Sequence, residues 1–129
     1  MATVDNIMSR HLLTVETTAA LDEAARQMHS HGVGAVLVLA GDRLEGILTE
    51  RDVLRAVATG GVEGTHVAAW MTRDPETVAL DDSTGHAAAL MIHGGFRHLP
   101  VVDGGRPVGI VSIRDLMRLV LDDESPRGA

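Results

Sequence analysis

The sequence contains an internal repeat that spans almost the whole chain. When the 129 residues are aligned with themselves at an offset of 63 positions, residues 4–57 match residues 67–120 without a gap. Of these 54 positions 18 are identical, where chance would give about 3 to 5. Because this period is longer than the units of a solenoid, it indicates a duplicated half-domain. We expect one structural unit built from two similar halves packed about a pseudo-two-fold axis.

Each half predicts the same order of elements, β-α-β-β-α, and hence an α/β fold. Apolar residues at helical spacing follow a short extended segment, then come two apolar strands joined by a glycine-containing turn, and a final helix. In the first half we expect these elements at 14–15, 21–31, 36–39, 44–48 and 50–58. In the second half we expect them at 77–78, 84–93, 99–102, 107–111 and 113–121.

The composition between and after the halves defines the domain boundaries that we expect. Residues 60–66 begin with Gly60-Gly61 and contain Gly64, which is typical of a linker. The last residues are acidic and then read Ser-Pro-Arg-Gly, which is typical of a disordered tail. We therefore expect repeat 1 at 4–59, a linker at 60–66, repeat 2 at 67–121 and a disordered tail at 122–129.

Composition excludes several classes of function. The chain has no cysteine, so disulfides, thiolate zinc sites and cysteine nucleophiles are ruled out. The net charge of −7, and aromatic residues limited to Trp70 and Phe96, argue against a nucleic-acid binder of the base-stacking type. No apolar run approaches the roughly 18 residues of a membrane span, and the first residues lack a secretory signal pattern. We expect a cytoplasmic protein that does not associate with membranes.

Motifs of catalysis and of metal binding are also missing. The chain has neither a Gly-x-Ser-x-Gly elbow nor a His-Glu-x-x-His helix, and Gly32-Val-Gly34 lacks the third glycine of a dinucleotide loop. The seven histidines include the pairs His29/His31 and His86/His93, but their spacing does not supply the four ligands of a structural zinc site. We expect no enzymatic activity, no bound metal and no permanently bound cofactor.

Three motifs carry a resemblance to a known family. The first half contains Gly-Ile-Leu-Thr-Glu-Arg-Asp-Val-Leu at 46–54, and the second contains Gly-Ile-Val-Ser-Ile-Arg-Asp-Leu-Met at 109–117. The second half also reads Arg-His-Leu-Pro-Val-Val-Asp at 97–103. Together with the β-α-β-β-α order, these strings resemble the CBS domain, named for cystathionine β-synthase. The resemblance covers about residues 4–120 and implies a tandem pair of CBS repeats, or Bateman module.

The resemblance implies a ligand and the residues that hold it. In this family, clefts between the two repeats bind adenosine-containing ligands, and a Ser/Thr-x-x-Asp motif contacts the ribose. The matching residues are Thr49 with Asp52, and Ser112 with Asp115. Basic residues before the second strand of the opposite repeat contact the phosphates. They correspond to Arg97 and His98 in repeat 2.

The same positions in repeat 1 are Gly34 and Ala35, which carry no charge. We therefore expect two unequal clefts. The cleft that combines Thr49 and Asp52 with Arg97 and His98 suits a phosphorylated ligand. The cleft around Ser112 and Asp115 is expected to be empty or to hold a less anionic molecule.

The residues themselves allow two interpretations. An ionised Asp can accept both hydroxyls of a ribose diol, and a helix N-terminus favours an anion. However, Thr49-x-x-Asp52 and Ser112-x-x-Asp115 also read as capping boxes. Both roles are compatible if the hydroxyl caps the helix while the carboxylate reaches outward. Arg97 can equally be an ordinary surface charge, and His98 a hydrogen-bonded strand residue.

These considerations give one main functional hypothesis and two alternatives. The main one is a free-standing regulatory CBS pair that senses an AMP, ADP or ATP type of ligand and signals to an effector protein. S-adenosylmethionine or a dinucleotide is left open as the ligand, and the family resemblance implies a homodimer formed through helical faces. The first alternative is a ligand-free protein–protein interaction module. The second is a nucleic-acid regulator. It would need an arginine-rich face, whereas the arginines of this sequence are scattered along the chain.

Overall fold

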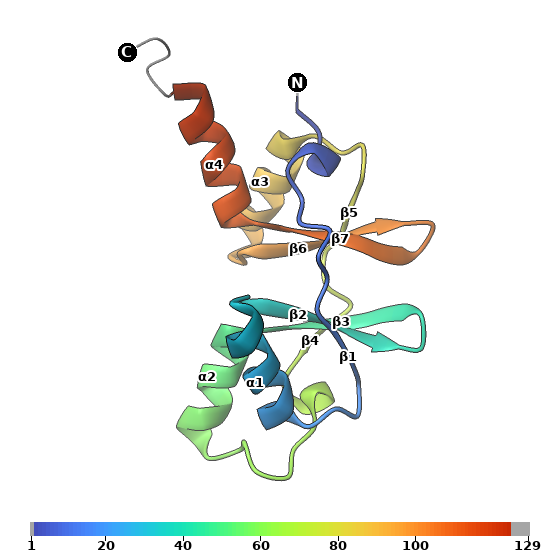
Figure 1. The fold of residues 1–129 in the computed structure, drawn as a ribbon, viewed down its shortest axis with the longest axis vertical. Coiled ribbons are helices and arrows are strands. Elements are labelled where there is room, and N and C mark those ends of the chain that lie inside the picture. Colours follow the sequence, from blue (N-terminus) through green and yellow to red (C-terminus); the bar gives the residue numbers. More distant parts are fainter. Residues whose placement is uncertain (1, 125–129) are drawn as a thin grey trace. The chain divides into compact units, whose positions relative to one another are not determined.

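A computed structural model of the chain describes residues 2–124, with side chains as far as Leu121. The chain forms two compact units, and their boundaries differ from those of the sequence repeats (Figure 1). Unit 2 is the continuous segment His11–Pro75. Unit 1 combines the first residues, up to Arg10, with the chain from Glu76 onward. The start of each repeat therefore belongs to the unit that contains most of the other repeat.

Unit 2 is a four-stranded sheet with its two α-helices on one face (Figure 1). The strand order is β1-β2-β3-β4, in which β1 and β2 are parallel and the other pairs are antiparallel. Its elements are β1 (Thr14–Glu16), α1 (Leu21–His31), β2 (Ala35–Ala40), β3 (Arg43–Thr49), α2 (Glu50–Thr59), the 3-10 turn η2 (Val67–Ala69) and β4 (Thr72–Arg73).

The core of unit 2 explains why these segments pack together. Helix α1 buries residues spaced by three and four positions, and the strands bury alternate residues on the helix side. Residues from the beginning of repeat 2 complete this core. Its buried members are Leu21, Ala24, Met28, Val36, Val38, Leu48, Ala56, Val67 and Met71.

Unit 1 has the same plan, with a three-stranded sheet in the order β5-β6-β7. Helices α3 and α4 lie on one face of this sheet (Figure 1). Its elements are the 3-10 turn η1 (Val4–Asn6), β5 (Val78–Ala79), α3 (Thr84–Gly94), β6 (His98–Asp103), β7 (Arg106–Ser112) and α4 (Ile113–Glu124). The core residues include Val4, Met8, Met91, Leu99 and Val111.

Backbone hydrogen bonds attach the start of each repeat to its unit, and we call these starts the exchanged segments: residues 4–10 in unit 1 and 67–75 in unit 2. In unit 1, the Val4 N–H donates to the Asp82 carbonyl at 2.8 Å, and Ser9 forms an antiparallel bridge with Ile110 of β7. In unit 2, the Val67 N–H donates to the Ala19 carbonyl at 2.9 Å, and β4 pairs with β3. The two attachments occur at repeat-equivalent positions. They bury Val4 and Val67 completely.

The predicted α/β class and the β-α-β-β-α order of both halves are confirmed. One strand begins later than expected: β5 starts at Val78 and not at Thr77. In unit 2 the Leu37 N–H donates to the Leu13 carbonyl at 3.0 Å. The equivalent residue of Leu37 is Pro100, which has no N–H to donate, so the parallel ladder in unit 1 is shorter.

The ends of the chain and the linker also differ in detail from expectation. Helix α4 continues to Glu124, so the first three residues of the expected tail are helical. The rest of that tail, 125–129, lies outside the described residues. Within the expected linker, the Thr65 carbonyl accepts a hydrogen bond from the Leu21 N–H at 3.0 Å, which attaches this segment to unit 2. Between residues 2 and 124, no helix has the length and apolar character needed to cross a bilayer.

Candidate ligand-binding site

In unit 2, the two predicted ribose-binding residues lie at the junction of β3 and α2. Thr49 ends the strand and is the N-cap of the helix, and Asp52 occupies the third helical position. One carboxylate oxygen of Asp52, Oδ2, accepts from the Thr49 backbone N–H at 2.9 Å and from the Thr49 hydroxyl at 3.1 Å. This is the capping-box arrangement, in which the acid satisfies a backbone donor that the helix itself leaves without a partner.

The second oxygen of Asp52 has a different partner. Oδ1 lies 3.2 Å from Nη1 of Arg55, one helical turn further along α2. The Asp52 side chain is only 6% exposed, whereas the Arg55 side chain is 57% exposed. The Arg55 guanidinium also lies over the ring of Trp70, 5.6 Å from its centroid. Asp52 is thus a buried carboxylate with one oxygen held by the backbone and the other facing a cation.

In unit 1, Ser112 and Asp115 repeat this arrangement at the junction of β7 and α4. Asp115 Oδ2 accepts from the Ser112 backbone N–H at 2.8 Å, and the Ser112 hydroxyl accepts from the Asp115 N–H at 3.1 Å. The repeat-equivalent arginine, Arg118, lies further from its acid, with Nη1 at 3.8 Å from Oδ1. The Asp115 side chain is 16% exposed. Its carboxylate is therefore more accessible than that of Asp52.

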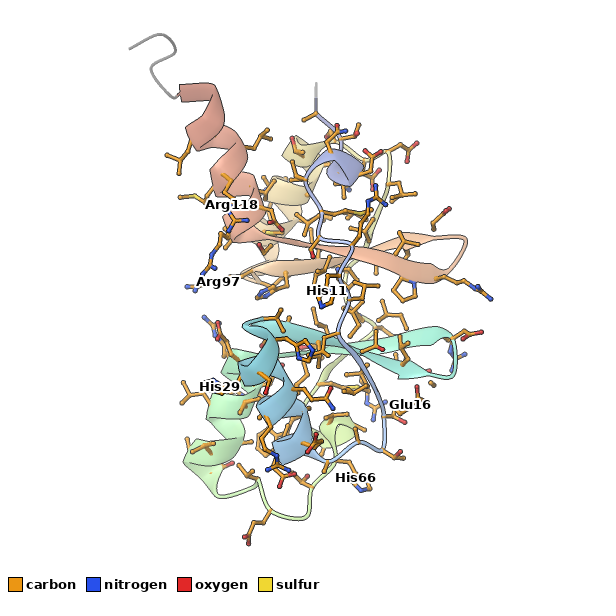
Figure 2. The ribbon with its side chains drawn as sticks, in the orientation of Figure 1. His11, Glu16, His29, His66, Arg97 and Arg118 are labelled. Carbon is orange, nitrogen blue, oxygen red and sulfur yellow. The ribbon has the colours of Figure 1, made fainter. Side chains whose placement is uncertain are left out.

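Arg97 and His98 lie close to Ser112 within unit 1. The Arg97 carbonyl accepts from the Ile113 N–H at 2.8 Å, and His98 is paired with Ser112 in the β6–β7 ladder. The Arg97 side chain is exposed, and that of His98 is half-buried. Figure 2 shows Arg97 and Arg118 on the same side of this unit. A positively charged edge therefore borders the N-terminal end of α4.

In unit 2 the two positions equivalent to Arg97 and His98 carry no charge. There the Gly34 carbonyl accepts from the Glu50 N–H at 3.0 Å, and Ala35 is paired with Thr49. The backbone geometry is the same as in unit 1, and only the side chains differ. The structure thus brings four of the six predicted site residues together in unit 1 and the other two in unit 2. That Thr49 and Asp52 share one ligand with Arg97 and His98 stays a prediction.

The capping-box interpretation of both motifs is confirmed, and the aspartate takes part in the cap. In both units Oδ2 of the aspartate turns back to the N-cap N–H, so the carboxylate does not reach outward as a whole. The physical reason is the position of the acid at the third helical residue, from which its side chain returns over the first turn. Only the other oxygen, Oδ1, faces away from the backbone of the cap.

The sequence interpretation missed three residues of this region. Arg55 and Arg118 follow their aspartates by three positions and are identical at the repeat offset, so the repeat itself carried the signal. The contact of Trp70 with Arg55 had no such signal. Trp70 is equivalent to Ile7, and its contact depends on the exchange of segments between units.

Among the side chains that the structure describes, residues 2–121, no group of three or more His, Asp or Glu residues is arranged to hold a metal ion. His11 and His31 form a ring contact, with centroids 6.2 Å apart, and His31 Nδ1 lies 2.8 Å from the Gln27 carbonyl oxygen. This pair is a local packing contact of unit 2.

Comparison with known proteins identifies relatives of this architecture. The CBS domain-containing protein YhcV of Bacillus subtilis is 35% identical over 130 residues, which cover all of this chain and 93% of that protein. A crystal structure of the CBS domain pair of protein MJ0100, in complex with 5′-methylthioadenosine and S-adenosyl-L-methionine, is similar with a TM-score of 0.91. That structure is 28% identical, and the match covers 96% of this chain and 99% of the other.

A second solved structure contains a nucleotide. The CBS domain protein PAE2072 from Pyrobaculum aerophilum, complexed with AMP, has a TM-score of 0.87 and is 29% identical. The match covers 95% of this chain and 97% of that one. The family model for the CBS domain matches residues 4–59 and again residues 67–122. The chain therefore belongs to the CBS domain family and contains two copies of that domain.

Proposed function

We propose that this chain is a regulatory protein that binds an adenosine-containing ligand of the AMP, ADP or ATP class and signals its presence to an effector protein. The observation that carries the proposal is the pair of capping aspartates, Asp52 and Asp115, at repeat-equivalent helix N-termini. Relatives that were crystallised with AMP, or with 5′-methylthioadenosine and S-adenosyl-L-methionine, support the adenosine class. The ligand is regulatory, and neither catalysis nor a permanently bound cofactor is part of the proposal.

The geometry of the cap suits the binding of a sugar. Because Oδ2 of Asp52 is held by the Thr49 N–H, the orientation of the whole carboxylate is fixed before a ligand arrives. Oδ1 keeps lone pairs that can accept hydrogen bonds from ribose hydroxyls. Hydrogen bonds to an ionised acceptor are stronger than those between neutral groups, at about 1.5–3 kcal/mol each. Asp115 presents the same chemistry in unit 1.

Phosphate binding requires positive charge, and it is supplied unequally. The exposed guanidinium of Arg97 can form a bidentate contact with phosphate oxygens, and His98 lies beside it in β6. We propose that these two residues bind the phosphate of the ligand whose ribose is held by Thr49 and Asp52. The site of Ser112 and Asp115 would then hold a less anionic molecule or stay empty.

Signalling would require two arrangements of the protein with different affinities for the ligand. A ligand held by residues of both repeats would favour one of them. The proposed assembly for this role is a cytoplasmic homodimer. Exposed apolar residues on α2 and α4 support it, because Leu54, Val57, Met117 and Val120 are each more than half exposed.

The proposal can be tested by thermal unfolding and calorimetry with AMP, ADP, ATP and S-adenosylmethionine. We expect at least one of them to raise the melting temperature of the wild-type protein. Asp52→Asn keeps an oxygen that can cap Thr49 but removes the charge, so it should lose most of that rise. Asp22→Asn, the same change on the exposed face of α1, should retain it. If none of these compounds changes the melting temperature or binds with measurable heat, the ligand-sensing function is wrong.

A second function, an interaction module without a small ligand, is favoured by the same apolar faces of α2 and α4. It predicts stable complexes with another protein that do not respond to adenine compounds. Affinity capture with and without AMP distinguishes the two functions. Only a sensor would show complexes whose yield depends on the nucleotide.

A further inference from the structure

The clearest difference between the two halves of the candidate site lies in how each arginine is held. Arg55 lies 3.2 Å from Asp52, and Arg118 lies 3.8 Å from Asp115. The Arg55 guanidinium also lies over the ring of Trp70. At the position equivalent to Trp70, unit 1 has Ile7, which packs against the apolar core and offers no aromatic face.

Trp70 is itself held firmly in place. A Cβ atom added to Gly61 would lie 2.7 Å from Cζ2 of the indole, so the ring rests directly on the backbone of Gly61. Glycine at this position allows the close approach of the ring, which then presents its face to Arg55. A cation over an aromatic face is attracted by the negative face of the ring. Arg55 is therefore restrained by two partners, Trp70 and Asp52.

This restraint has a consequence for ligand binding. The cap holds Oδ2 of Asp52, so Oδ1 is the oxygen that remains for ribose hydroxyls. Arg55 is paired with that same oxygen. We propose that Arg55, held by Trp70, is a specificity-determining residue that competes with the ribose for Asp52 and so weakens binding at this site. Arg118 would compete less at Asp115, because its ion pair is longer and lacks the aromatic support.

The inference rests on the proposed function, and it also separates two roles that an arginine can have near a nucleotide. A competitor for Asp52 opposes binding of the sugar, whether or not the ligand is charged. A phosphate-binding arginine assists AMP and has no effect on adenosine. Uncharged adenosine is thus the probe that distinguishes the two roles. The matched 2′-deoxyadenosine lacks one of the two hydroxyls.

The experiment is calorimetric titration of the full chain with adenosine, 2′-deoxyadenosine and AMP. Arg55→Met keeps an unbranched side chain that can pack on Trp70 while removing the charge. We expect this variant to bind adenosine about two to five times more tightly, the range that corresponds to a partly exposed ion pair. The gain should be smaller for 2′-deoxyadenosine. Arg118→Met, the matched control, should produce a smaller gain than Arg55→Met.

Two further variants connect the effect to the residues named. Asp52→Asn combined with Arg55→Met should abolish the gain, since no charged carboxylate is left to release. Trp70→Leu should reproduce part of the gain, because it removes the support of Arg55. The wild-type and Arg55→Met proteins contain one tryptophan and no tyrosine. Their fluorescence emission therefore reports whether the surroundings of Trp70 stay intact.

The possible results separate this inference from the proposed function. If the wild-type protein binds AMP but Arg55→Met binds adenosine no more tightly, the competition is wrong and the function stands. Weaker AMP binding with unchanged adenosine binding would make Arg55 a phosphate ligand and overturn the inference. If neither protein binds any of the three compounds, the competition is wrong, and the proposed function is decided separately by the titrations with ADP, ATP and S-adenosylmethionine.

Discussion

The side chain of Met71 lies directly on the backbone of Gly46. A Cβ atom at Gly46 would lie 2.6 Å from the Met71 sulfur and 2.7 Å from the Thr72 carbonyl oxygen. Met71 comes from the beginning of repeat 2, and Gly46 lies in β3 of repeat 1. Gly109 and Met8 form the equivalent close contact in unit 1. Each exchanged segment thus packs against a glycine of the strand next to it.

Gly46→Ala should therefore destabilise the protein. The methyl group would meet a backbone carbonyl oxygen that cannot rotate away, and overpacking of this kind costs about 1–3 kcal/mol. Urea denaturation measures the change in the free energy of unfolding. Gly85→Ala is the matched control, because an added Cβ meets only the Ser83 hydroxyl at 3.9 Å and alanine favours the helix. A stabilised Gly46→Ala variant would contradict the contact described here.

The exchange also predicts which fragment of the chain can fold. Unit 2 is continuous in sequence, so a fragment 11–75 contains its complete core, including Val67 and Met71. A fragment 4–59 follows the sequence repeat but lacks both of these residues. Circular dichroism and proton NMR should show a cooperative fold for 11–75 and none for 4–59. A folded 4–59 fragment would show that the exchanged segment is dispensable.

The sequence repeat predicts most of the fold but does not predict this exchange. Hydrophobic periodicity and turn residues locate the strands and helices, because each depends on neighbours close in sequence. The residence of Val4 in one unit and of Val67 in the other depends on long-range contacts between segments more than 40 residues apart. The repeat alignment does not show which unit each residue joins, since it aligns Val4 with Val67 whether or not the segments are exchanged.

The candidate site was predicted to a similar extent. The motif Thr49-x-x-Asp52 and its equivalent in unit 1 predict both a cap and a ligand site, and local geometry decides only the cap. Arg97 lies close to Ser112 because the β6–β7 ladder pairs the next residue, His98, with Ser112. The contact between Arg55 and Trp70 could not be predicted, because it joins a helix to an exchanged segment.

Asp52 should contribute to stability even without a ligand. Asp52→Ala leaves the Thr49 N–H without its acceptor, and the loss of such a cap typically costs about 0.5–2 kcal/mol. Asp52→Asn should cost less, since its amide oxygen can still accept that hydrogen bond. Urea denaturation of the ligand-free proteins measures both changes. Equal losses in the two variants would show that charge, rather than capping, stabilises this helix end.

The exposed apolar faces of α2 and of α4 should mediate the proposed dimer. Leu54 and Met117 occupy equivalent positions on these helices and are mostly exposed. Leu54→Glu and Met117→Glu each place a charge on one of these faces, so they should shift the mass measured by light scattering from dimer to monomer. Ile92→Glu puts the same charge on α3 and should leave the dimer intact. Dimers that survive both charged variants would place the interface elsewhere.

The proposed phosphorylated ligand uses residues from both repeats, with Arg97 at its phosphate and Asp52 at its ribose. Arg97→Ala should weaken AMP binding about 10-fold or more, which corresponds to the loss of one charge-assisted hydrogen bond, and should leave adenosine binding unchanged. Arg114→Ala removes an exposed arginine from α4 and serves as the control. Calorimetry measures both affinities.

Combining Arg97→Ala with Asp52→Asn then tests whether the two residues share one site. If they hold the same AMP molecule, the double variant should lose a single binding event, and the stoichiometry should fall by that one site. If Arg97 instead serves Asp115, which belongs to the same unit, the two changes should abolish two separate binding events. In that case the effects of Arg97→Ala and Asp115→Asn on AMP binding should not be independent of each other. The effects of Arg97→Ala and Asp52→Asn should be additive. This result would assign the phosphorylated ligand to the residues of unit 1 alone.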